Sequence, residues 1–224
     1  MIRTENISRQ FKSGREIVYA LRDINIEIQS KSLTILRGRS GSGKTTLINL
    51  MGALDSPTAG KIFIDDKEIT SLSDVKKDNL RRNSIGFIFQ SIALMPLMTA
   101  YENVDFGLRV AGYEPGERKK RAEDCLAMVG LQKRMHHLPQ ELSGGEQQRV
   151  AIARAIAHKP KVVFADEPTA ELDTNMGLQV VKVLKDLVQE EGLTVIMTTH
   201  DPSMVDIADC VYTLEDGMIV DMGE

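Results

Sequence analysis

Residues 33–51 read LTILRGRSGSGKTTLINLM, and this stretch decides the fold. Residues 33–36 are a short apolar run that is typical of a buried strand, and residues 44–51 have the pattern of a helix. Between them, residues 38–45 fit the motif G-x-x-x-x-G-K-[ST]. A glycine-rich loop in this position binds phosphate, because its main-chain N–H groups can surround the phosphate oxygens at the helix N-terminus.

The side chains of this loop provide the charge and the metal ligand that a nucleotide requires. Lys44 places a positive charge beside the phosphates, and the Thr45 hydroxyl can ligate Mg²⁺. The alternative is a glycine-rich turn that binds nothing, but the flanking strand and helix favour the phosphate loop. We therefore predict a nucleotide site formed by Gly38, Arg39, Ser40, Gly41, Ser42, Gly43, Lys44, Thr45 and Thr46.

A second glycine turn lies at residues 142–149, which read LSGGEQQR and lead into the apolar run 150–157. The turn can be an ordinary helix start, with Ser143 as the N-cap and Glu146 completing a capping box. Its exposed N–H groups and the positive end of the helix dipole also make it an anion site. The independent phosphate loop upstream favours the anion site.

Two acidic residues, Asp166 and Glu167, follow the apolar run 162–165. At the carboxyl end of a parallel strand, such side chains face the ligand crevice. Asp166 is therefore placed to hold Mg²⁺. Gln90 and His200 also follow predicted strands, and the Gln90 amide can touch either Mg²⁺ or a water.

The remaining patterns predict an α/β fold with a parallel-sheet core, antiparallel β additions and an inserted helical lobe. Alternating apolar residues at 24–28 predict a half-exposed antiparallel strand, and Asp216-Gly217 predicts a hairpin turn. Residues 91–157 have helical patterns. We expect one domain, residues 1–224, with a catalytic core from 1–90 and 158–224 and a helical lobe from 91–157.

Composition narrows the possible partners and the compartment. The net charge of −4 gives no field that would attract nucleic acid, so no nucleic-acid partner is expected. No apolar run approaches the length of a membrane span, and the first residues do not resemble a signal peptide. The two cysteines are expected to be buried free thiols of a cytoplasmic protein.

With both glycine motifs, the chain resembles the ATP-binding subunit of ABC transporters over residues 1 to about 222. Residues 86–90 (GFIFQ), 94–104 (LMPLMTAYENV) and 165–169 (ADEPT) are most similar to the subset that acts in lipoprotein release and in macrolide or peptide efflux. The resemblance implies a P-loop NTPase fold of the ABC ATPase type, and ATP hydrolysis with Mg²⁺ coupled to transport.

The resemblance also implies roles for individual residues. Glu167 corresponds to the catalytic carboxylate that polarises the attacking water, and His200 to the switch histidine that contacts the γ-phosphate. Gln90 corresponds to the Q-loop, which links the nucleotide state to rotation of the lobe. The predicted catalytic residues are therefore Glu167, His200 and Gln90, and the predicted Mg²⁺ ligands are Thr45, Gln90 and Asp166.

An aromatic residue near the N-terminus should stack on adenine. Phe11 is the expected residue, where the family usually has tyrosine, and Tyr19 is the competitor. Phenylalanine keeps the π face and loses only the hydroxyl, so stacking should survive.

The resemblance implies that two ATPase subunits, identical or different, pair head-to-tail about a two-fold axis. Each ATP would lie between one chain's phosphate loop and the other chain's signature turn: Ser143, Gly144, Gly145 and Glu146. Asp173 belongs to the segment that resembles the D-loop, which meets the other subunit. Further departures from the family's usual pattern include Arg39 in the phosphate loop and Glu171 beside the D-loop.

A membrane permease is the expected second partner. The apolar loop from Leu94 to Tyr101 is either lobe core or an exposed patch, and by resemblance it is where a transmembrane subunit docks. The chain would then lie on the inner face of the cell membrane. Two alternatives stay open: an ATPase of a signalling or cell-division complex, and a soluble ABC ATPase that acts on ribosomes or DNA.

Overall fold

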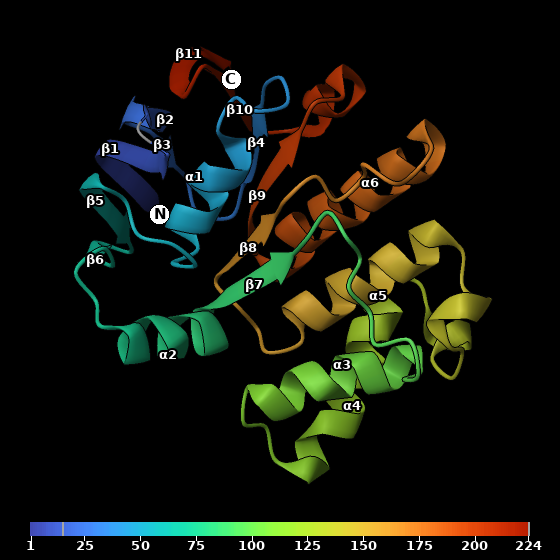
Figure 1. Cartoon of the computed structure of the whole chain (residues 1–224). Coiled ribbons are helices and arrows are strands. Elements are labelled where there is room, and N and C mark those ends of the chain that lie inside the picture. Colours follow the sequence, from blue (N-terminus) through green and yellow to red (C-terminus); the bar gives the residue numbers. More distant parts are fainter. Residues whose placement is uncertain (15, 224) are drawn as a thin grey trace.

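The computed structural model describes residues 1–14 and 16–223, and two β-sheets dominate it (Figure 1). The main sheet has the strand order β11-β10-β4-β9-β8-β7. These strands are β4 (Leu33–Arg37), β7 (Ile85–Ile88), β8 (Val162–Ala165), β9 (Thr194–Thr199), β10 (Cys210–Glu215) and β11 (Met218–Gly223). Neighbouring strands pair in parallel except for the antiparallel β10–β11 hairpin.

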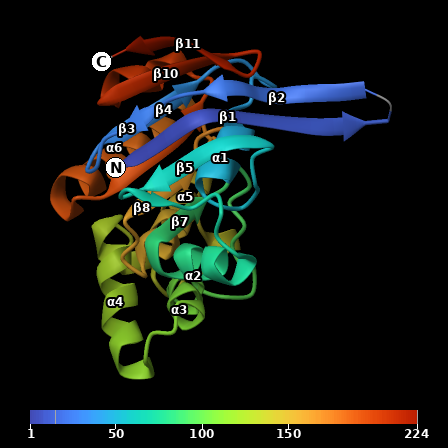
Figure 2. The same ribbon diagram turned by 90° about the vertical axis from the view of Figure 1, so that its left-hand side faces the viewer.

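The second sheet is antiparallel and has the strand order β2-β1-β5-β6, with β3 also paired to β1. Its strands are β1 (Ile2–Ser13), β2 (Glu16–Ile24), β3 (Glu27–Ile28), β5 (Ala59–Ile64) and β6 (Lys67–Glu68). The distal part of the β1–β2 hairpin projects beyond the rest of the molecule (Figure 2).

Six α-helices occur in the described residues: α1 (Lys44–Met51), α2 (Asp74–Ser84), α3 (Ala100–Val110), α4 (Pro115–Met128), α5 (Gly144–Ile156) and α6 (Thr174–Glu191). Short 3₁₀ helices lie at η1 (Gln132–Arg134), η2 (Pro139–Glu141) and η3 (Pro202–Ile207). Helix α5 lies between the α3–α4 pair and the main sheet (Figure 1). None of these helices is long and apolar enough to span a bilayer, within the part of the chain that the structure describes.

The main sheet separates two hydrophobic cores. Successive side chains of a strand point to opposite faces, so Ile35 packs into one core and Leu36 into the other. The first core also contains buried residues of α3 to α6, and the second contains those of α1 and of the antiparallel sheet. This arrangement fixes β4 and α1, and hence the loop between them, near the middle of the molecule.

The predicted α/β fold with a parallel core and antiparallel additions is confirmed. The expected strand at 24–28 is interrupted, because β2 ends at Ile24 and only Glu27–Ile28 pair again, with β1. Two arginines of the basic run 118–121, near the start of α4, point toward the protein rather than into solvent. Arg118 pairs with the buried Asp105 carboxylate, and Arg121 donates to the main-chain oxygens of Ile156 and Ala157.

Candidate functional site

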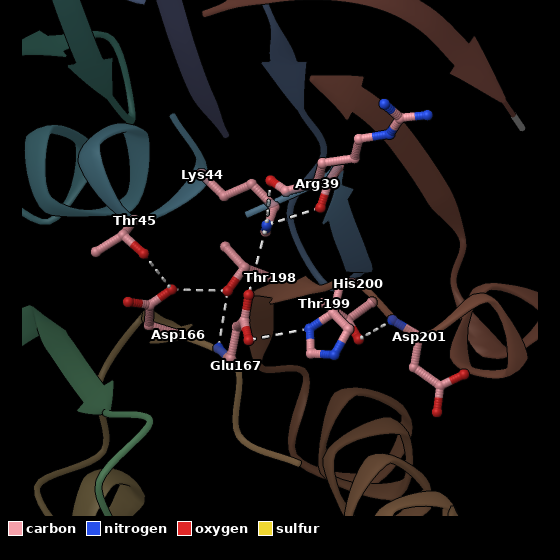
Figure 3. Close-up of polar contacts among 10 residues, drawn as sticks. Arg39, Lys44, Thr45, Asp166, Glu167, Thr198, Thr199, His200 and Asp201 are labelled. Atoms are coloured by element: carbon pink, nitrogen blue, oxygen red, sulfur yellow. Dashed lines mark hydrogen bonds and ion pairs between the residues drawn. The ribbon is translucent and has the colours of Figure 1, made fainter. Parts of the chain in front are cut away.

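The predicted phosphate loop curls around the ammonium group of Lys44. Lys44 is buried, and its Nζ donates to the main-chain oxygens of Gly38 at 2.8 Å and Arg39 at 3.2 Å (Figure 3). Gly43 has a φ of 106°, and a Cβ there would lie 2.6 Å from the Ala20 oxygen. Only glycine fits both constraints, so the sequence and the β2 strand together determine this curvature.

A polar atom within the loop has no partner in the described protein. The Ser42 side chain is 5% exposed, and its Oγ makes no hydrogen bond within residues 1–14 and 16–223. A buried hydroxyl without a partner costs free energy. This hydroxyl, together with the Lys44 ammonium, fits an anionic ligand.

Strand β8 ends in the two predicted acids, and the first of them contacts the phosphate loop. The Thr45 hydroxyl donates to Asp166 Oδ1 at 3.1 Å (Figure 3). Thr198, on β9, donates to the same oxygen at 2.7 Å and accepts from the Glu167 N–H at 2.8 Å. Sequence reasoning missed Thr198; its position two residues before His200, at the end of an apolar strand, was the available signal.

The Glu167 carboxylate lies between Lys44, at the start of α1, and His200, which follows β9. Its Oε1 lies 3.4 Å from Lys44 Nζ, and its Oε2 lies 3.1 Å from His200 Nδ1 (Figure 3). Its φ is 44°, in the left-handed region that a residue with a Cβ seldom adopts. A strained backbone at a strand end, held by surrounding hydrogen bonds, is common at functional sites.

Lys44, Thr45, Glu167 and His200 line one cavity of about 870 Å³, whereas Ser42 and Asp166 are not among its described lining residues. Its lining includes eleven of the predicted site residues: Gly38, Arg39, Ser40, Gly41, Gly43, Lys44, Thr45, Thr46, Gln90, Glu167 and His200. The carboxyl ends of β4, β7, β8 and β9 thus meet, as the parallel sheet requires. The structure brings together segments that are separated by up to 162 positions, from Gly38 to His200.

The second glycine turn lies apart from this cavity. No residue of 143–146 is among the described residues that line it. Ser143 caps α5 and forms the predicted capping box with Glu146. The Ser143 N–H donates to the Glu146 carboxylate at 2.9 Å, and this bond holds the pKa of Glu146 below its ordinary value.

The two candidate adenine-stacking residues lie on opposite faces of the β1–β2 hairpin. Phe11 pairs with Val18, and Tyr19 pairs with Gln10. Because side chains alternate along a strand, Phe11 and Val18 share one face, and Gln10 and Tyr19 share the other. The register shifts next to Ala20, which lines the cavity. Neither Phe11 nor Tyr19 itself lines it, among the described residues; Phe11 is 43% exposed and has the Arg9 guanidinium over its ring.

The apolar loop before α3 is part core and part surface. Leu94 packs against the core that contains α3 to α6 and one face of the main sheet, whereas Leu97 is 90% exposed. The buried Asn103 side chain holds the loop, accepting from the Met95 N–H and donating to the main-chain oxygens of Met95 and Met98. Leu97 is therefore presented on an ordered loop.

Comparison with known proteins identifies the family. Residues 21–170 match the family model described as ABC transporter. The chain is 43% identical over 223 residues to the uncharacterized ABC transporter ATP-binding protein MJ0796 of Methanocaldococcus jannaschii, covering 98% of this chain and 95% of that protein. It is 47% identical over 216 residues to the macrolide export ATP-binding/permease protein MacB of Bartonella henselae, covering 96% of this chain and 33% of MacB.

The fold agrees with solved cassettes. A structure described as the dimeric post-hydrolysis state of the ATP-binding cassette MJ0796, bound to ADP and Pi, superposes with a TM-score of 0.90. That match has 40% identity and covers 100% of this chain and 98% of the other. With the phosphate loop and the acidic strand end in one cavity, the chain belongs to the ABC transporter family, as an ATP-binding component that hydrolyses ATP.

Proposed function

We propose that two copies of this ATPase, or one copy and a related subunit, close head-to-tail around two ATP molecules. The observation that carries the proposal is the separation of the two glycine turns. The cavity of one chain contains the phosphate loop but not residues 143–146, so a single chain offers only half of a two-sided phosphate site. A second chain would bring its own Ser143, Gly144 and Gly145 to the open side. The dimeric description of the MJ0796 cassette supports this arrangement.

Within each site, the residues divide the work by their chemistry. Lys44 and the loop N–H groups would hold the phosphates, and Phe11 would stack on the base. Glu167 would orient the attacking water and accept its proton, with His200 beside the same carboxylate and Gln90 in the lining of the same cavity. Asp173 would act at the contact with the other subunit. Within its own chain, its side chain caps α6 by accepting a hydrogen bond from the Met176 N–H.

The oxygen donors of the site fit Mg²⁺. Thr45 Oγ1 and Asp166 Oδ1 lie 3.1 Å apart beside the phosphate loop, and the Gln90 amide lines the same cavity. Mg²⁺ prefers such oxygen ligands and keeps several waters. When bound, it would neutralise charge on the phosphates.

The complete assembly would include a membrane permease. Its contact would be the loop from Leu94 to Tyr101, where Leu97 is exposed. The MacB relatives are named macrolide export proteins, which supports an export role, and the proposed substrate is hydrophobic or peptide-like. The ATPase would then lie at the cytoplasmic face of the membrane, with 1–90 and 158–224 as its catalytic core and 91–157 as the lobe that meets the permease.

ATP-dependent dimerisation of Glu167→Gln tests the proposal. This change keeps the shape of the side chain and removes its charge, so the closed state should persist with ATP and Mg²⁺. Size-exclusion chromatography should show a dimer with ATP and a monomer without it. Adding Ser143→Arg should abolish the dimer but leave ATP binding intact. A Glu167→Gln protein that stays monomeric with saturating ATP would overturn the arrangement.

A further inference from the structure

Arg39 and Glu171 are two exposed, oppositely charged residues without side-chain partners in the described part of the chain. Arg39 lines the cavity, and its side chain points away from the Lys44–Glu167 cluster (Figure 3). The neighbouring Arg37, in contrast, donates to Thr213 and pairs with Asp221. Glu171 lies between the acidic strand end and α6, and no hydrogen bond or ion pair joins its carboxylate to another described residue.

Glu171 belongs to a segment that packs beside the second glycine turn. Leu172, the residue after Glu171, lies close to Gly144: a Cβ added to Gly144 would be 3.2 Å from Leu172 Cδ2. A Cβ on Gly145 would be 3.5 Å from the Met176 sulfur, in the first turn of α6. Leu172 and Met176 therefore pack against the turn at 143–145, and Glu171 is the exposed residue directly before this contact.

The proposed head-to-tail dimer brings this region to the cavity of the other copy, and the inference rests on that arrangement. A lone carboxylate carried toward phosphates would be repelled. A cation on the cavity rim removes this penalty, because opposite charges across an interface are favourable and like charges cost several kcal/mol. Arg39 lies on that rim.

We propose that, in the ATP-bound dimer, the Arg39 guanidinium of each chain pairs with Glu171 of the partner subunit. The two-fold axis repeats the pair, so each dimer contains two of them. Each chain carries both Arg39 and Glu171, so two copies of the chain present complementary charges to one another. A second copy of this same chain is the partner that this charge pattern fits.

A charge-reversal experiment in the Glu167→Gln protein tests the pair. Arg39→Glu alone and Glu171→Lys alone each place like charges at both contacts. Each should raise the dimer dissociation constant about tenfold or more with ATP and Mg²⁺, measured by analytical ultracentrifugation. An equimolar mixture of the two single variants should restore the dimer, because both contacts in the mixed dimer join opposite charges. The double variant should also dimerise.

The mixing result separates a contact between chains from one within a chain, because a pair inside one chain gains nothing from mixing. A mixture that dimerises no better than the single variants would overturn the pair. Loss of the dimer in the Glu167→Gln parent would instead overturn the head-to-tail arrangement. Direct ATP-binding measurements accompany each variant. If Arg39→Glu fails to bind ATP, Arg39→Ala replaces it, and its mixture with Glu171→Lys should still dimerise better than Glu171→Lys alone.

Discussion

The ammonium group of Lys44 lies 3.4 Å from the Glu167 carboxylate, which joins the phosphate loop to the end of β8. Both side chains are largely buried, with exposed fractions of 4% and 18%. The lysine that would hold the phosphates is therefore also the positive neighbour of the carboxylate that would activate water. The two functions meet within one polar cluster.

This relationship predicts different losses for the two residues. Glu167→Gln should slow ATP hydrolysis by about 10²-fold or more, as expected for a lost general base, with little loss of ATP binding. Lys44→Ala should weaken both binding and hydrolysis, because it removes the charge beside the phosphates. Steady-state hydrolysis and equilibrium ATP binding distinguish the two. Wild-type turnover by Glu167→Gln would remove this residue from the chemistry.

Phe11 should contribute to adenine binding. Phe11→Ala is expected to weaken ATP binding by roughly 1–3 kcal/mol, the range for base–aromatic stacking, and Phe11→Tyr should be nearly neutral. Tyr19→Ala is the matched control, because Tyr19 lies on the opposite face of the same hairpin and is similarly exposed. Normal binding by Phe11→Ala with impaired binding by Tyr19→Ala would reverse the assignment.

Leu97 should contribute to the contact with the proposed membrane permease but not to the stability of the fold. Leu97 is 90% exposed, so Leu97→Asp should leave the free energy of unfolding within about 0.5 kcal/mol of wild type. Stimulation of hydrolysis by the proposed membrane permease should fall. Val75→Asp, at a position that is 78% exposed on α2, controls for adding a charge elsewhere. Equal effects of the two variants would show that the loop has no special role.

Arg154 should stabilise the segment that follows Gln90. Its guanidinium, on α5, donates to the main-chain oxygens of Ala93 at 2.8 Å and Ile92 at 3.4 Å. Arg154→Met removes both hydrogen bonds, and because Ala93 is exposed and its oxygen can bind water, the free energy of unfolding should fall by about 0.5–1.5 kcal/mol. Arg154→Lys can still donate and should lose less. Urea titrations measure both, and Lys182→Met on the exposed surface of α6 is the control.

His158 should make stability sensitive to mildly acidic pH. Burial lowers the pKa of His158 below its ordinary value near 6.5, and its Nε2 lies 3.0 Å from the Ile85 oxygen, where it donates. The unfolded chain therefore takes up the proton first as the pH falls. The contribution of the neutral His158 side chain to the free energy of unfolding is therefore complete above pH 6.5. Below pH 6.5 it decreases by up to about 1.4 kcal/mol per pH unit.

Urea titrations between pH 7.5 and 5.5 measure this slope. His158→Asn keeps a donor for Ile85 but cannot titrate, so its stability should fall less across the same range. A variant with the same pH dependence as wild type would show that other groups cause the slope.

Local sequence determined the elements whose own residues carry a strong pattern. The glycine motif predicted the loop between β4 and α1, and the capping box that the sequence offered at Ser143 as the alternative to an anion site is present. Helix α2 was not predicted, because none of its residues is buried and its sequence therefore lacks the periodic apolar residues that indicate a helix. The β1–β2 hairpin was missed because much of β2 is exposed and lacks regular alternation.

Only the tertiary structure decided which of these segments meet. The sequence indicated that Gln90, Asp166 and His200 follow strands, but the strand order that places β8 and β9 beside β4 depends on contacts distant in sequence. The same contacts bring Thr198 to Asp166, and they separate the turn at Ser143 from the Lys44 cavity. A glycine turn or an apolar run is set by neighbouring residues, whereas strand order is set by burying two faces of a sheet at once.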